Sequence, residues 1–118
     1  MIKLKDLLLE AVVMDLPMAE ELATRIQKEV KVPFINASVS TLGGKERPSV
    51  MVKISLDPKR EWENGIYQNS RYAQFHFDYE GTIEQFSTYG LSKKFRKARF
   101  KTAAEAIQKL NTYIKQVQ

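Results

Sequence analysis

Six cationic side chains follow one another closely in the C-terminal part of the chain, with no acidic residue between them. They are Lys93, Lys94, Arg96, Lys97, Arg99 and Lys101. Cations in such a run can neutralise phosphates, and the interleaved rings of Phe95 and Phe100 could stack on bases or anchor the segment. The run therefore predicts nucleic-acid binding without sequence specificity. The alternative is a solvated surface with both rings turned into the core.

The formal net charge of the 118-residue chain is +5, and it is unevenly distributed. Residues 93–118 hold eight Lys or Arg against one Glu, a balance of +7. Residues 1–92 hold eleven Lys or Arg against thirteen Asp or Glu, a balance of −2. The basic character therefore belongs to the C-terminal segment, as expected of an electrostatic footprint for phosphates.

Catalytic chemistry is poorly supplied, since the chain has one His and no Cys. His76, Asp78 and Glu80 alternate along a predicted strand, and one imidazole with two carboxylates on one face could ligate a metal ion. Alternation also predicts a solvated polar face of an antiparallel sheet, and metal ligands of this kind usually come from more than one element. We therefore predict a non-enzymatic protein with no metal and no cofactor.

The helix that must position the basic run is predicted for residues 102–117. Thr102 and Glu105 have the spacing of a capping box, in which the Thr hydroxyl accepts from the Glu105 N–H and the carboxylate returns to the Thr102 N–H. Apolar residues then recur at intervals that place them on one helical face. They are Ala103, Ala106, Ile107, Leu110, Ile114 and Val117. This stripe must be buried, and the strand-rich middle of the chain is its expected partner.

A second amphipathic helix is predicted for residues 18–31. Pro17 suits a first helical turn, although it disfavours helical angles at Leu16, and Pro33 ends the pattern. The apolar residues at helical spacing are Ala19, Leu22, Ala23, Ile26 and Val30. They predict that one side of this helix is also buried.

The middle of the chain predicts strands, because apolar and polar residues alternate with a period of two. The expected strands cover residues 35–39, 50–56, 73–79 and 82–89, with a short fifth within 95–101. In the fourth, Ile83, Phe86 and Tyr89 do not share one face, which predicts either a bulge or a strand shorter than the apolar residues suggest. We therefore expect one α+β domain over residues 1–118, in which an antiparallel sheet of four or five strands in chain order carries both amphipathic helices on one face.

The N-terminal segment, residues 1–16, has helical apolar spacing over residues 3–14. Its stripe includes Leu4, Leu8 and Val12, which would either pack across the domain or form an arm that docks on another subunit or a larger assembly. The second interpretation predicts a structural or assembly protein with homo-oligomer or assembly partners. It is the alternative to nucleic-acid binding.

No apolar stretch is long enough for a transmembrane span. Asp6 and Glu10 interrupt an N-terminal stretch that only faintly imitates a signal peptide. The absence of Cys excludes disulfides and thiolate metal sites. We therefore expect a cytoplasmic protein that has no membrane partner.

The start of the basic run resembles the C-terminal signature of the double-stranded-RNA-binding domain. The matching residues are Ser92, Lys93, Lys94, Lys97, Ala103, Ala104 and Leu110. The resemblance implies that the three lysines grip phosphates at the start of the last helix. The cap at Thr102 comes later than in that family, and the stretch from Asp57 to Tyr89 is longer.

The first ten residues, from Met1 to Glu10, are similar to the starts of small uncharacterised proteins of marine tailed phages. The similarity covers less than a tenth of the chain. It implies a protein of a phage, in the host cytoplasm or the virion, and identifies no activity.

Overall fold

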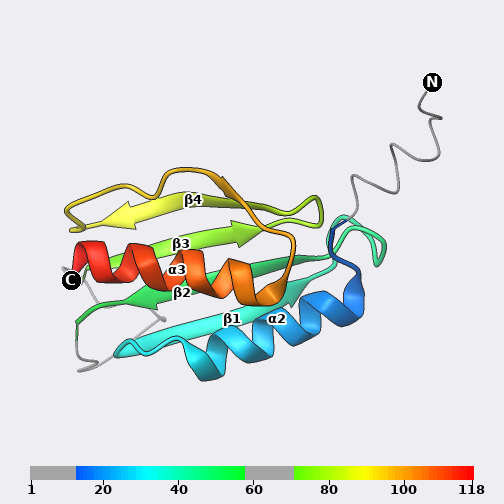
Figure 1. The fold of residues 1–118 in the computed structure, drawn as a ribbon, viewed down its shortest axis with the longest axis horizontal. Coiled ribbons are helices and arrows are strands. Elements are labelled where there is room, and N and C mark those ends of the chain that lie inside the picture. The colour runs from blue at the N-terminus through cyan, green and yellow to red at the C-terminus, as the bar shows by residue number, and fades with distance from the viewer. Residues whose placement is uncertain (1–12, 58–70) are drawn as a thin grey trace.

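The computed structural model describes residues 13–57 and 71–118. Its elements are α2 (Leu16–Glu29), β1 (Phe34–Ser40), β2 (Ser49–Ser55), β3 (Tyr72–Phe77), β4 (Thr82–Tyr89), β5 (Ala98–Arg99) and α3 (Ala103–Val117). The five strands form one antiparallel sheet in the order β1-β2-β3-β4-β5, and both helices lie across the same face of it (Figure 1). The predicted α+β fold class is confirmed, with five strands in chain order.

Helix α2 begins earlier than the sequence indicates, at Leu16 rather than at residue 18. The Asp15 carboxylate accepts a hydrogen bond from the Met18 N–H at 2.9 Å and so caps the first turn. Pro17 lies in that turn, where its missing N–H costs no intrahelical bond. The buried residues of α2 are Ala19, Leu22, Ala23 and Ile26. The helix packs on β1 and β2 and against α3.

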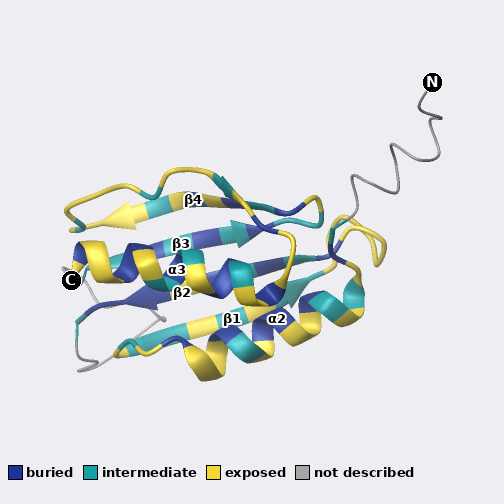
Figure 2. Cartoon of the chain, viewed as in Figure 1, coloured by how far each residue is buried: buried dark blue, intermediate teal, exposed yellow. Residues whose placement is uncertain are grey.

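Helix α3 begins at the predicted cap, where the Thr102 hydroxyl accepts from the Glu105 N–H at 3.1 Å. Among the described contacts, no bond returns from the Glu105 carboxylate to the Thr102 N–H, so only half of the predicted capping box forms. The buried stripe is the predicted one with Tyr113 added. Buried and exposed sides alternate along both helices (Figure 2), as expected when one side of an amphipathic helix meets a sheet.

Cross-strand pairing places the apolar residues of the sheet on the face that the helices cover. One row across that face runs through all five strands: Val39, Val50, Phe77, Ile83 and Ala98. Because side chains alternate along a strand, the residues directly before and after these in each strand project from the opposite side. We call that side the open face, since neither described helix lies over it (Figure 1).

The bulge predicted in the fourth strand is confirmed. Gln74 pairs with Ser87 and Phe75 pairs with Gln85, so Phe86 is the extra residue of β4. The alternation therefore shifts at this point. Gln85 is buried on the helix side, whereas the Phe86 side chain is 53% exposed.

The edge of the sheet at β1 is partly covered by the side chain of Gln27 in α2. Gln27 Nε2 donates to the Ile35 carbonyl at 2.9 Å, and the Ala37 N–H donates to Gln27 Oε1 at 2.9 Å. One side-chain amide therefore satisfies a carbonyl and an N–H that another strand would otherwise pair with.

The predicted N-terminal docking stripe, Leu4, Leu8 and Val12, lies outside the described residues. Its role as an arm therefore stays a prediction. Within residues 13–57 and 71–118, no helix is long and apolar enough to cross a membrane.

Candidate functional site

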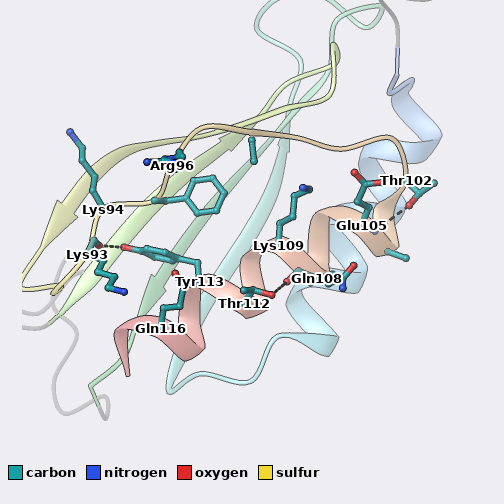
Figure 3. Close-up of a pocket in the computed structure, with 13 residues that line it drawn as sticks. Lys93, Lys94, Arg96, Thr102, Glu105, Gln108, Lys109, Thr112, Tyr113 and Gln116 are labelled. Carbon is teal, nitrogen blue, oxygen red and sulfur yellow. Dashed lines mark hydrogen bonds between the residues drawn. The ribbon is translucent and has the colours of Figure 1, made fainter.

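The basic segment, residues 93–101, leads from the β4 edge of the sheet to the start of α3 and forms one wall of a groove (Figure 3). The polar side of α3 forms the other wall, because the buried stripe of the helix fixes which side meets the sheet. The groove has a volume of about 1040 Å³.

Four cations line this groove from its two walls. Lys93, Lys94 and Arg96 come from the basic segment, and Lys109 comes from α3 (Figure 3). Glu105 is the one acidic residue among the described residues that line it. The groove therefore favours an anionic ligand.

The structure divides the six predicted cations into two groups, although all six are exposed. Lys97, Arg99 and Lys101 do not line the groove. Arg99 belongs to β5 and is the cross-strand partner of Thr82. The neighbouring pair, Ile83 with Ala98, projects from the helix side of the sheet. Because side chains alternate, Arg99 projects from the open face.

None of the six predicted cations, nor Lys109, forms an ion pair with a carboxylate among the described residues. The described ion pairs join Arg25 to Glu29 and Arg71 to Asp57, away from the groove. Within the described part of the chain, the positive charge of the groove is thus not neutralised by a salt bridge.

A buried polar network holds the first part of the basic segment in place. The Phe95 N–H donates to Gln85 Oε1 at 2.6 Å, and Gln85 Nε2 donates to the Tyr113 hydroxyl at 3.3 Å. The hydroxyl in turn donates to the Lys93 carbonyl at 2.5 Å (Figure 3). In each of these bonds an N–H or O–H group donates to an oxygen that can accept. The network therefore fixes the backbone from which Lys93 and Lys94 project.

The Tyr113 hydroxyl is kept in its neutral, donating form. Burial raises its pKa above the ordinary value of 10.0, and the hydrogen bond from Gln85 opposes part of that rise. The hydroxyl is therefore protonated at neutral pH. Its proton belongs to the bond with the Lys93 carbonyl, so it acts as a structural donor.

The other end of the basic segment is fixed at the turn between β3 and β4. The Phe100 N–H donates to the Gly81 carbonyl at 2.8 Å. Gly81 has a φ of 84°, and an added Cβ would lie 2.5 Å from the Phe100 carbonyl oxygen. This close approach requires glycine.

The two phenylalanines of the segment anchor it to the core. The Phe95 ring packs edge-on against Phe75 and Tyr113, with centroid distances of 5.4 Å to each. Phe100 is 1% exposed and packs against Phe77 at 5.9 Å. The interpretation of both rings as free stacking platforms is therefore wrong for Phe100 and is not supported by the packing of Phe95.

The structure does not bring together the predicted His76, Asp78 and Glu80 constellation. Strand β3 ends at Phe77, so Asp78 and Glu80 belong to the following turn. The Asp78 carboxylate accepts from the Glu80 and Thr82 N–H groups at 3.0 and 3.1 Å, which shapes that turn. The described residues contain no group of three His, Asp or Glu side chains that could hold a metal ion.

Sequence reasoning missed Lys109 and Gln85. The helical period places Lys109 on the wetted side of α3, but it does not say that the basic segment crosses that side. Gln85 is a polar residue at a strand position that faces the core. Alternation from Ile83 places it on the helix side, but the pattern does not reveal the partners that its amide has there.

The arrangement implied by the double-stranded-RNA-binding domain is wrong for this chain. Helix α3 begins at Ala103, and the Lys93 carbonyl lies beside Tyr113 in the second half of that helix. The lysine run is therefore not at the start of the last helix. Comparison of the chain with protein-family models, curated proteins and solved structures gave no match. The similarity to phage proteins stays a prediction.

Proposed function

We propose that this protein is a non-enzymatic nucleic-acid-binding module that holds phosphates in the groove between the basic segment and α3. One observation carries the proposal. Lys93, Lys94, Arg96 and Lys109 line one groove from two elements, and the described residues offer none of them an ion pair.

The chemistry of the groove suits phosphates of a polymer. Each Lys or Arg that contacts a phosphate releases condensed counterions, and this release drives binding without reading the base sequence. Gln108 and Gln116 also line the groove from α3, and their amides can donate to phosphate or sugar oxygens (Figure 3). The ligand would therefore be held mainly through its backbone.

The groove is also organised before any ligand arrives. The bonds of Gln85 and Tyr113 fix one end of the basic segment, and the Phe100–Gly81 bond fixes the other. A segment that is already ordered loses less conformational entropy on binding. This supports a binding function for the basic segment, which has little helix or strand structure of its own.

The test is fluorescence-anisotropy binding to DNA and RNA oligomers at low salt. The groove variant replaces Lys93, Lys94, Arg96 and Lys109 with Gln. A matched control variant replaces Lys28, Lys31, Lys45 and Lys115 with Gln, which removes the same charge from exposed positions outside the groove.

We expect the groove variant to bind about tenfold more weakly or worse, and the control variant to lose much less. Equal losses in the two variants would show that net charge alone is responsible. Absence of binding by the unmodified protein at low salt would reject the proposed function.

A further inference from the structure

The open face of the sheet carries an aromatic cluster on β3 and β4. Tyr72 and Tyr89 are cross-strand partners whose rings stack with centroids 6.1 Å apart and planes inclined by 18°. Phe86 is 53% exposed and Tyr89 is 48% exposed. Rings this exposed are unusual on a folded surface and indicate a binding site when they gather on one face.

Phe86 lines a hollow of the open face with a volume of about 600 Å³. Phe86, Met51 and His76 line it from the central strands, and Arg47 and Tyr79 line it from the neighbouring turns. The Arg47 guanidinium lies over the Tyr79 ring, 5.8 Å from its centroid. A volume of this size, with apolar rings and a few polar groups, is typical of sites that take flat organic ligands.

Two cations, Lys53 of β2 and Arg99 of β5, also project from the open face. Lys53 is exposed and pairs across the sheet with Gln74, in the row next to Tyr72 and Tyr89. Arg99 belongs to the basic segment and projects from the open face through its pairing with Thr82. The basic segment therefore contributes a cation to the open face as well as three cations to the groove.

Two carboxylates also line the hollow, those of Asp78 and Glu84. The Asp78 carboxylate is bonded to the N–H groups of residues 80 and 82. Glu84 is exposed, and a carboxylate at such a position can accept a hydrogen bond from the amino group of a base. Arg47, Lys53 and Arg99 offset these two carboxylates, so that the five side chains together carry a net charge of +1.

We propose that the open face stacks unpaired bases, so that the protein binds single-stranded nucleic acid in preference to duplex. This inference rests on the proposed function. Bases in a duplex keep their faces stacked on each other, whereas unpaired bases can be splayed out onto aromatic side chains. Phe86 supplies such a ring, and Arg99 of the basic segment projects from the same face, where it can meet a phosphate of the strand.

The experiment compares three probes of equal length in anisotropy titrations: a single strand, the same strand annealed to its complement, and an abasic strand that has phosphates but no bases. We expect the single strand to bind more tightly than both others. Phe86→Ala is expected to weaken single-strand binding by about 5- to 150-fold, the range measured for loss of one base–aromatic stack. Binding of the abasic strand is expected to be unchanged by this substitution.

Two variants keep the result interpretable. Phe86→Tyr retains a ring and is expected to retain single-strand binding. Thr88→Ala changes an exposed residue of the same strand whose cross-strand partner is the buried Ala73, so it projects away from the open face. It is expected to have no effect on any probe.

Salt dependence separates stacking from charge. Phe86→Ala should lower affinity without changing the slope against salt, because it removes no phosphate contact. The inference is overturned if the abasic and normal strands bind equally and Phe86→Ala behaves like Thr88→Ala. If the groove variant still weakens binding in that case, the proposed function stands alone. If no probe binds at low salt, both fail.

Discussion

The sheet has two edges, and a glutamine side chain works at each of them. At the β1 edge, the exposed Gln27 comes from α2 and bonds to the backbone of Ile35 and Ala37. At the β4 edge, Gln85 is only 8% exposed and bonds to the Phe95 N–H and the Tyr113 hydroxyl. The same type of side chain therefore has a different role at each edge.

The difference shows that a side chain at a sheet edge can either hinder pairing with a further strand or hold a neighbouring segment in place. Gln27 occupies backbone groups that water could also satisfy, so it mainly discourages pairing with another strand. At the other edge, β5 pairs with β4 through only two residue pairs, Thr82 with Arg99 and Ile83 with Ala98. Beyond that point, the Gln85 side chain accepts from the Phe95 N–H in place of a ladder bond, and Lys93, Lys94 and Arg96 beside this bond line the groove.

The largest effect is expected for Gln85→Leu. The substitution introduces an apolar side chain of similar size and leaves the partly buried Phe95 N–H without its acceptor and Tyr113 without its donor. We expect the free energy of unfolding to fall by about 1–3 kcal/mol, as measured by urea denaturation. A loss smaller than that of an average surface substitution would contradict the role given to this amide.

A smaller effect is expected for Gln27→Ala. Water can replace the lost bonds to Ile35 and Ala37, so the free energy of unfolding should fall by only about 0.5–1 kcal/mol in the same experiment. Nucleic-acid affinity should not change. An equal loss of stability in both glutamine variants would contradict the claim that the buried Gln85 stabilises the fold more than the exposed Gln27.

The smallest effect is expected in the pH dependence of stability. The pKa of Tyr113 is raised in the folded protein, so its stabilising contribution is fully present below the unfolded pKa of about 10 and is lost as pH rises through the folded pKa. Denaturation of the unmodified protein and Tyr113→Phe over this range tests the sign. The stability advantage of the unmodified protein should shrink with rising pH, and a growing advantage would reverse our assignment.

The sequence predicts the elements well because their signals are local. The Thr102 cap, the apolar stripe of α3 and the alternation in the strands each involve residues a few positions apart. The spacing of Ile83, Phe86 and Tyr89 left a bulge or a shorter strand open, and the pairing of β3 with β4 shows the bulge. These features depend on geometry that each element carries by itself.

The groove could not be predicted in the same way. It exists because the backbone of Lys93 meets Tyr113, which is twenty residues later in the chain, and because Phe95 meets Gln85, which is ten residues earlier. Periodicity does not report such contacts between elements. For the same reason, Lys109 could be placed on an exposed side but not in a site, and Lys97 and Lys101 could not be separated from the groove cations.

The most direct test of the account is the slope of log affinity against log salt for a single-stranded oligomer. Each phosphate contact on a single strand contributes about −0.7, so four groove cations should make the slope of the unmodified protein steeper than that of the groove variant by about 3. The control variant, with Gln at positions 28, 31, 45 and 115, should keep the original slope. Equal flattening in both variants, or none in the groove variant, would contradict the assignment of phosphate binding to this groove.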